Sequence, residues 1–505
     1  MTEGPNLDLA AVGPVILVGI GAMLVLVTEV MLAGRASFLG RPVTKAWLGS
    51  VLAVISSFFL VLALVVAWQS FLVGGAPVFN PENPMVRLDR LASFSVALIA
   101  LGSLLACLLS VAYLAELRIN HGEYYALLLL ATSGMMLLVS ATDLIMVFLG
   151  IEIMSIPIYV LAGFDRRRLT SNESALKYFV VGSFASALLL YGMALLYGAT
   201  GHTDFAGIRT AFDPANPLAT IGLALVVVGF TFKISSVPFH QWTPDVYEGA
   251  PTSVTAYMAV TVKVAAFAAL LRFVVEGLGG AETALPQVLW VLAALTLVVG
   301  NFVAIVQDNV KRLLAYSSIA HAGYVLIGFV AGSQEGYAAV LFYLLVYVFM
   351  NLGAFGVIVA LARRGRDTER IQDFAGLAQR RPALAALMTL FMLSLAGIPG
   401  TGGFMAKLLI FKAAVNEGAI VLTVLGVLTS VVSVYYYLRL PVAMYMREPG
   451  AELPRRELAS GEGLVLALCA LVVLLLGIVP NNAPTFLFSW IRALDWTRDS
   501  IAMLF

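Results

Sequence analysis

Four of the seven lysines of this sequence, Lys177, Lys233, Lys263 and Lys407, lie within or at the mouth of long apolar stretches. A charged side chain at the centre of a bilayer costs roughly 2.5–3.5 kcal/mol on insertion scales, and intramembrane ionisable groups usually line an ion or proton route. This placement predicts a role in carrying ions or protons rather than in anchoring the chain.

Glu152 is the acidic candidate. It lies about nine residues, roughly 13 Å of helix, beyond the start of its apolar stretch at Asp143. A carboxylate within about 4–6 Å of a buried ammonium favours the charged form, and its withdrawal favours release of the proton. A Glu152–Lys233 pair of variable separation could therefore load and unload a proton. The alternative is a static buried ion pair that only locks two helices together.

The other ionisable candidates differ in depth. Lys263 is about twelve residues from the nearest helix end, too deep to snorkel, whereas Lys177 is near enough to an end to do so. His321 lies mid-helix among hydroxyl side chains and titrates near neutral pH, although a neutral packing histidine fits equally well. Lys407 follows a helix break, and Glu29, in the first apolar stretch, is compatible with either function or packing.

Two prolines interrupt apolar stretches close to these lysines. Pro238 follows Lys233 by five positions and removes the hydrogen bond that would satisfy the carbonyl of Ile234. Pro399, among four glycines, precedes Lys407 by eight positions. Transporters place such discontinuous helices at their ion sites, so we expect functional breaks here rather than ordinary kinks.

The elements that position these residues are all helical. The chain has 505 residues, 61% hydrophobic and 12% charged, and its apolar runs are long enough to span the bilayer. We expect an all-α polytopic membrane protein of about fourteen helices, without a soluble domain. The expected helices are 12–33, 46–73, 91–115, 124–141, 143–164, 176–200, 217–240, 251–275, 285–306, 312–332, 337–362, 382–415, 418–440 and 462–480.

The two breaks fall in the seventh and twelfth helices, which suggests a five-helix unit used twice, in helices 4–8 and 9–13. An odd number of helices per unit makes successive copies inverted. Residues 1–505 would then form a single membrane domain. Its parts would be 1–115 (helices 1–3), 124–275 and 285–440 (the repeats), and 462–505 (the last helix and a tail).

Loop charges predict the orientation. Most Lys and Arg of the connections follow odd-numbered helices, among them Arg166–Arg168, Lys311 and Arg312. The positive-inside rule makes that side cytoplasmic and puts both termini on the opposite side. We expect the first apolar stretch to be a retained span rather than a signal peptide. The tail 484–505, with Trp490 and Trp496, is typical of an interfacial segment or of an ordinary short helix.

No cofactor or metal site is predicted. Cys107 and Cys469 lie far apart in apolar stretches, and no Cys or His spacing suggests zinc, haem or an iron–sulfur cluster. No Gly-rich nucleotide loop follows a strand. The net charge of +1 gives no indication of nucleic-acid binding.

The run Phe232-Lys-Ile-Ser-Ser-Val-Pro-Phe-His-Gln-Trp-Thr-Pro-Asp-Val-Tyr-Glu-Gly-Ala-Pro-Thr-Ser-Val254 closely resembles the signature between the seventh and eighth helices of the antiporter-like subunits of respiratory complex I. That complex is the proton-pumping NADH:quinone oxidoreductase. The resemblance extends over essentially the whole chain.

The resemblance implies a membrane-arm subunit of the bacterial inner (plasma) membrane. It implies that protons are carried by a Glu on helix five and by lysines on helices six, seven, eight and twelve, which match Glu152, Lys177, Lys233, Lys263 and Lys407. NADH, FMN, iron–sulfur clusters and quinone would be handled by other subunits, the partners of this chain. The alternatives are a subunit of a multi-chain Na⁺/H⁺ antiporter, which resembles the same family, and a passive scaffold.

Overall fold

The computed structural model describes residues 7–35, 37–38, 41–42, 44–279, 284–362, 369–449, 457–478, 492–502 and 504. Thirteen helices in this part of the chain are long and apolar enough to cross a membrane. Two shorter helices, α15 (Pro382–Ala396) and α16 (Gly402–Asn416), lie where one further span is expected. The fourteen expected spans therefore correspond to thirteen long helices and to the pair α15 and α16.

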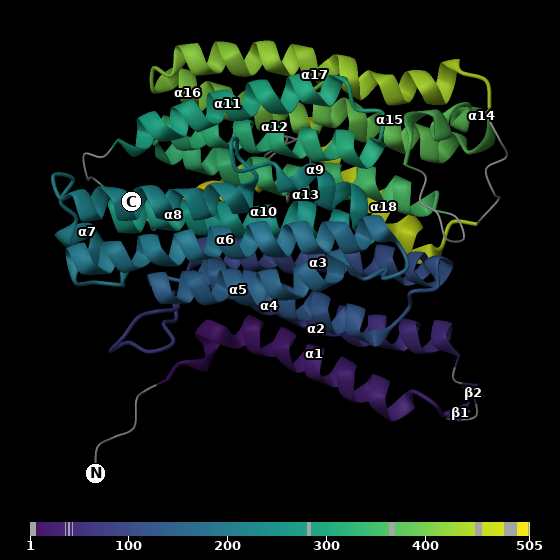
Figure 1. Cartoon of the computed structure of the whole chain (residues 1–505), viewed down its shortest axis with the longest axis horizontal. Coiled ribbons are helices and arrows are strands. Elements are labelled where there is room, and N and C mark those ends of the chain that lie inside the picture. The colour runs from purple at the N-terminus through teal and green to yellow at the C-terminus, as the bar shows by residue number, and fades with distance from the viewer. Residues whose placement is uncertain are drawn as a thin grey trace.

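The long helices lie side by side, with α1 at one edge of the bundle and α17 at the other (Figure 1). They are α1 (Gly13–Leu32), α2 (Lys45–Val73), α3 (Arg90–Leu117), α4 (Gly122–Ser140), α5 (Leu144–Ala162), α6 (Leu169–Thr200), α8 (Pro217–Ile234), α10 (Thr252–Arg272), α11 (Leu285–Ile305), α12 (Val310–Ala331), α13 (Gln334–Ala360), α17 (Ile420–Met446) and α18 (Ser460–Ile478).

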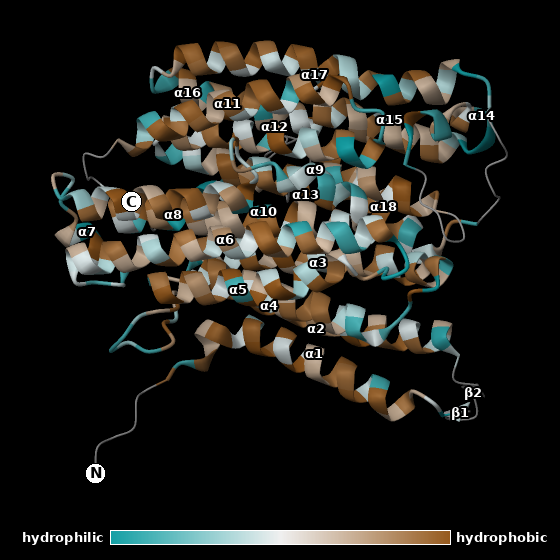
Figure 2. Ribbon diagram, viewed as in Figure 1, coloured by the Kyte–Doolittle hydropathy of each residue, from teal (hydrophilic) through white to brown (hydrophobic). Residues whose placement is uncertain are grey.

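Short elements join them. They are η1 (Leu9–Val12), β1 (Ser37–Phe38) antiparallel to β2 (Arg41–Pro42), α7 (Phe205–Ala211), α9 (Trp242–Gly249), the π-turn η2 (Phe273–Gly277), η3 (Ile371–Phe374), α14 (Leu377–Arg380) and α19 (Ala493–Ile501). Apolar residues dominate the long helices, and hydrophilic residues gather in the connections at their ends (Figure 2). Helix α19 lies within the expected tail, of which 484–491 are outside the described residues.

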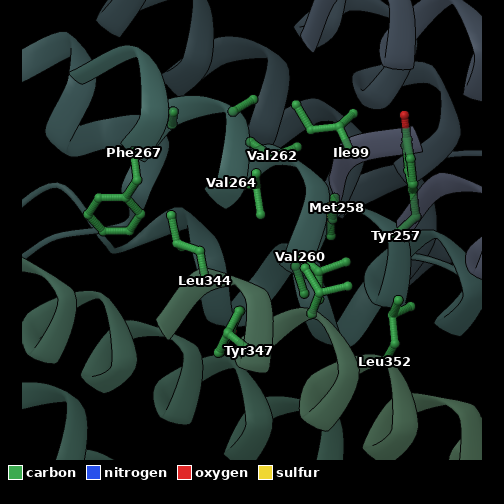
Figure 3. Packing of buried hydrophobic residues seen from close by; sticks show 14 of the residues in the cluster. Ile99, Tyr257, Met258, Val260, Val262, Val264, Phe267, Leu344, Tyr347 and Leu352 are labelled. Carbon is green, nitrogen blue, oxygen red and sulfur yellow. The ribbon is translucent and has the colours of Figure 1, made fainter. Parts of the chain in front are cut away.

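The core surrounds α10 and α13. In the most apolar window of each of these helices 94% of the residues are buried, against 33% for α1 and α2, which lie at the edge. Figure 3 shows Val262, Val264 and Phe267 of α10 packed with Ile99 of α3 and Leu344 of α13. A charged residue on α10 is therefore surrounded by protein rather than by lipid.

Contacts between loops define two faces of the bundle. The basic face joins the connections after α3, α5 and α11 to the segment before α14, and the opposite face joins the connections before α3, α5 and α7. On the basic face, Arg167 donates to the carbonyl of Leu117 (2.7 Å), Arg168 pairs with Glu369 (2.9 Å), and Asn309 forms a β-bridge with Arg370. On the opposite face, β-bridges join Val86 to Ala141 and Asp143 to Asp204.

Both proline-containing stretches are interrupted completely. Helix α8 ends at Ile234, and α9 begins at Trp242; α15 ends at Ala396, and α16 begins at Gly402. Gly397, at φ +86°, supplies the left-handed residue that ends α15. The seventh expected helix is therefore shorter than predicted. Helix α6 begins at 169 rather than 176, because its mainly polar first residues are helical although they carry no apolar signal.

Candidate functional site

Lys233 lies in the last turn of α8, where its charge complements the helix dipole, and it is only 3% exposed. Its ammonium donates a hydrogen bond to Ser155 Oγ of α5 (2.7 Å). The rings of Phe232, Tyr159 and Tyr178 lie 5.5–5.9 Å from Nζ, within range of cation–π attraction. One hydroxyl and an aromatic wall thus lie against this charge.

Side chains satisfy the backbone at the break after Lys233. Thr296 of α11 accepts a hydrogen bond from the amide of Val237 (3.0 Å) and bonds to the hydroxyl of Ser236 (2.8 Å). The indole of Trp242 donates to the carbonyl of Phe232 (3.2 Å). The interruption inside the bundle is therefore stabilised by specific partners.

Lys263 lies in the middle of the core and is 3% exposed. Its ammonium donates a hydrogen bond to the carbonyl of Ser318 in α12. The Ser318 hydroxyl accepts from Tyr347 (2.8 Å), which accepts from Asn351 (2.7 Å). This lysine is therefore one end of a polar chain that crosses from α10 to α13.

His321 lies one turn beyond Ser318 on α12 and is buried. Both ring nitrogens have hydroxyl partners: Nδ1 is 2.5 Å from Tyr343 and Nε2 is 3.1 Å from Tyr437. Because a hydroxyl can donate or accept, these contacts suit either tautomer of the ring. The histidine is thus held between α13 and α17.

Lys407 occupies the second break and is 4% exposed. Its ammonium donates to the carbonyl of Ala396, the last residue of α15 (2.9 Å), and to Ser430 Oγ of α17 (2.8 Å). It also lies 4.6 Å from the ring centroid of Tyr324. A carbonyl freed by the helix interruption therefore binds the lysine.

A continuous set of contacts joins the central groups. The His321 ring lies 5.3 Å from the ring of Tyr347, which belongs to the Lys263 chain, and 5.9 Å from Tyr324, which contacts Lys407. Lys263, His321 and Lys407 thus form one cluster, which we call the central chain. Aromatic rings extend from Lys233 to Tyr247 of α9, since Trp242 packs on Phe232 (5.3 Å) and on Tyr247 (6.4 Å).

Glu152 lies near Lys233 but is not bonded to it in the described part of the chain. It is half-buried on α5, its Oε1 has no hydrogen-bond partner in the described part of the chain, and it forms no ion pair with Lys233 there. Ser155, one turn further along α5, holds the lysine instead. A static Glu152–Lys233 lock is therefore not the arrangement in this structure.

Lys177 belongs to a different environment, on the basic face. Its side chain is 42% exposed and pairs with Glu173 (2.6 Å) and with Asp245 of α9 (2.8 Å), which also pairs with Arg312 (2.7 Å). Burial alone would raise the pKa of Asp245, but the hydrogen bonds from Lys177 and Arg312 hold it below its usual value. Lys177 therefore lies near the surface, at the end of a helix from which its side chain can reach the polar face.

The position of Lys311 differs from the prediction made from the sequence. We expected Lys311 among the basic residues of a loop. Helix α12 begins at Val310, one residue before Lys311, and the Lys311 side chain is fully buried. Its ammonium donates to the carbonyl of Ala250 (2.7 Å), which follows α9, and lies 3.8 Å from Glu369. The apolar run that begins after it gave no indication of this burial.

The sequence also missed a buried ion cluster on the opposite face, formed by Arg87, Asp89, Arg272 and Glu276. Arg272, at the end of α10, is fully buried and makes two 2.7 Å bonds to Asp89 and one of 2.8 Å to Glu276; Arg87 contacts both acids. Burial would raise the pKa of Asp89, but the charge of Arg272 holds it well below its usual range.

Glu29 contacts the start of a neighbouring helix. Its Oε1 accepts a hydrogen bond from the amide of Gly122, the first residue of α4 (2.7 Å). This contact satisfies one of the free amides at a helix N-terminus and joins α1 to α4.

The described residues contain no group of three or more His, Cys, Asp or Glu side chains that could hold a metal ion. The site is instead a set of buried lysines next to interrupted helices, and this combination defines an ion-coupled membrane transport protein.

Comparisons with known proteins agree with this class. Residues 141–433 match the family described as NADH:quinone oxidoreductase/Mrp antiporter, TM, and the chain belongs to this family. It is 46% identical to NADH-quinone oxidoreductase subunit N of Trichlorobacter lovleyi, over 83% of this chain and 87% of the relative. It is 43% identical to NADH-quinone oxidoreductase subunit N 1 of Sorangium cellulosum, over 96% and 98%.

A solved structure has the same architecture. A chain of respiratory complex I from Thermus thermophilus with bound aureothin superposes with a TM-score of 0.78 at 34% identity, covering 95% of this chain and 99% of that one. The expected family and fold class are confirmed.

Proposed function

We propose that this chain is the proton-translocating subunit N of an NADH:quinone oxidoreductase and works as part of that translocase. The observation that carries the proposal is the central chain, in which two buried ammonium groups and an imidazole are linked through tyrosine side chains inside the bundle. Glu152, Lys177, Lys233, Lys263, His321 and Lys407 are the proposed proton carriers, and Pro238 and Pro399 mark the breaks that expose backbone carbonyls to them.

In this proposal electrons never enter the chain. NADH, FMN, iron–sulfur clusters and quinone belong to other subunits, and the partners are the other membrane subunits, protons and the lipid bilayer. The protein lies in the inner membrane of a bacterium, with the basic face in the cytoplasm and both termini on the other side. Residues 124–275 and 285–440 act as two inverted repeats, each with one interrupted helix.

The energy scale is compatible with pumping. Moving one charge through a potential of about 200 mV costs roughly 4.6 kcal/mol. Bringing a carboxylate toward a buried ammonium, or withdrawing it, changes their interaction by several kcal/mol at a surface-like effective dielectric constant. Glu152, which lacks a fixed partner on Oε1, is the group able to make this change at Lys233.

The test is Lys233→Ala in the assembled complex, with proton uptake by inverted vesicles measured per NADH oxidised. We expect fewer protons per NADH, while Lys412→Ala, an exposed lysine on α16, leaves the ratio unchanged. Unchanged pumping by the Lys233 variant would support a passive scaffold instead.

The family description also covers Mrp antiporters, so a Na⁺/H⁺ antiporter subunit is the second candidate. Sodium-dependent proton flux in reconstituted vesicles without NADH would favour it. Co-purification with NADH dehydrogenase subunits would contradict it.

A further inference from the structure

A cavity of about 530 Å³ opens at the basic face between α1, α4 and α5. We call it the edge crevice. Its inner wall is apolar, formed by Leu26 of α1, Leu127 and Leu130 of α4, and Val160 of α5. Its volume falls in the range of small-molecule sites. None of the proposed proton carriers lines it.

The apolar wall reaches into the bilayer. Leu130 lies eight residues into α4, about 12 Å from its start at 1.5 Å per residue. Leu26 is 39% and Val160 48% exposed, so the crevice is open sideways toward the hydrocarbon. An occupant of its inner part must therefore be apolar and elongated.

The rim of the crevice carries positive charge. Arg118 and Arg166 are exposed and form no hydrogen bond through their side chains and no ion pair with any residue that the structure describes. Arg167 is already bound to Asp165 (3.0 Å) and to the carbonyl of Leu117 (2.7 Å), so the charge of Asp165 is compensated.

Two further rim groups leave the balance positive. Glu123 lies in the first turn of α4, where a carboxylate complements the helix dipole, and His121 is exposed beside it. Arg118 adopts the left-handed conformation at the end of α3, with φ 57°. Asn or Gly adopts that conformation more easily, so the backbone alone does not favour an arginine here.

We propose that the edge crevice binds an anionic phospholipid, with its phosphate between Arg118 and Arg166 and one acyl chain along Leu127, Leu130 and Val160. Guanidinium groups bind phosphate through paired N–H donors, and basic pockets between membrane helices bind anionic headgroups. A soluble anion would bind the arginines but leave the apolar wall of the crevice uncovered. An acidic peptide would need an apolar segment long enough to cover that wall.

The experiment uses the complex purified from membranes and placed in phosphatidylcholine vesicles with a trace of photoreactive phosphatidylglycerol, whose acyl chain carries a diazirine. Labelled peptides of α4 and α5 are quantified by mass spectrometry. Each arginine near the surface contributes about 1 kcal/mol to binding of anionic lipid, so Arg118→Asn with Arg166→Gln should weaken labelling about 30-fold. Arg209→Gln, an exposed arginine of α7, is the matched control and should leave labelling unchanged.

A second variant tests the apolar part. Val160→Trp fills the crevice from the exposed side of α5 and should abolish labelling, with NADH oxidation by the complex retained. Equal labelling by photoreactive phosphatidylcholine would overturn anionic recognition. Displacement by excess inorganic phosphate would show a soluble-anion site, and cross-linking of a neighbouring protein at Leu130 would show a protein contact; both would overturn the proposal.

Discussion

The buried cluster on the opposite face gives a prediction whose size follows from the structure. Arg87 and Arg272 face Asp89 and Glu276, so the cluster is neutral, and the side chains of Arg272 and Asp89 are 0% and 4% exposed. Asp89→Asn keeps the shape of the side chain and the cap on α3, because Asn is also a good N-cap. It leaves the cluster with one uncompensated buried charge.

Breaking a buried ion pair on one side costs about 3–5 kcal/mol. At about 2.1 cal/mol/K per residue, the unfolding entropy of 505 residues is about 1.1 kcal/mol/K, so the thermal midpoint should fall by about 3–5 °C. Asp308→Asn is the matched control because Asp308 pairs with Arg439 at the surface and is 82% exposed. It should lower the midpoint by less than 1 °C.

The assay is thermal unfolding of the purified chain in detergent, followed by intrinsic fluorescence, so that the 505 residues of this chain are the unit that unfolds. Adding Arg87→Gln to Asp89→Asn restores neutrality and should recover part of the loss. Equal midpoints for Asp89→Asn and Asp308→Asn would refute the reasoning, as would further destabilisation by the second substitution.

The pH dependence has a definite sign. The pKa of Asp89 is lowered in the folded state, so its contribution is complete above the unfolded value near 3.9 and is lost only as pH falls further, through the folded value. The difference in thermal midpoint between the wild type and Asp89→Asn should therefore be the same at pH 5.5 and pH 8. A difference that fades between these values would assign the effect to another group.

Three further substitutions test the site and its supports. Ser155→Ala removes the acceptor of the Lys233 ammonium, a bond worth about 1.5–3 kcal/mol, and should lower proton uptake per NADH in vesicles, whereas Ser155→Thr keeps the hydroxyl and should retain it. Glu29→Ala frees the amide of Gly122 and should lower the thermal midpoint by about 1–2 °C, whereas Glu29→Gln still offers an oxygen and should lower it less. Asp245→Asn removes half-exposed ion pairs that join α6, α9 and α12, so its cost of about 1 kcal/mol should largely disappear in 1 M salt.

The fold was predictable because a helix must have a long apolar stretch to cross the bilayer. Such stretches can be recognised whatever their exact sequence. The predicted helix boundaries are wrong where a helix begins before its apolar stretch. The polar first turn of α6 is helical although its composition is not apolar, and the first turn of α12 buries Lys311 among protein atoms that no sequence window reports.

The lysines could be selected from the sequence because inserting a charged side chain into the bilayer costs free energy. A lysine at the centre of an apolar run is therefore rare without a function. Their partners were not. The acceptors are the hydroxyl of Ser155, the carbonyl of Ser318 and the carbonyl of Ala396, groups that occur in every helix and become specific only through packing. Arg272 was missed because it lies at a helix end, where an arginine normally reaches solvent.

The structure separates two kinds of buried charge, and the separation bears on the competing functions. Arg272 is bound to carboxylates, so losing its charge would leave Asp89 buried and unpaired. Lys233, Lys263 and Lys407 are bound to neutral oxygens, which accept a hydrogen bond from an ammonium or from a neutral amine and are not left charged when a proton departs. A scaffold built from static ion pairs would need carboxylates bound to these three lysines. A proton route needs lysines that can lose their charge without leaving a bound carboxylate buried and unpaired.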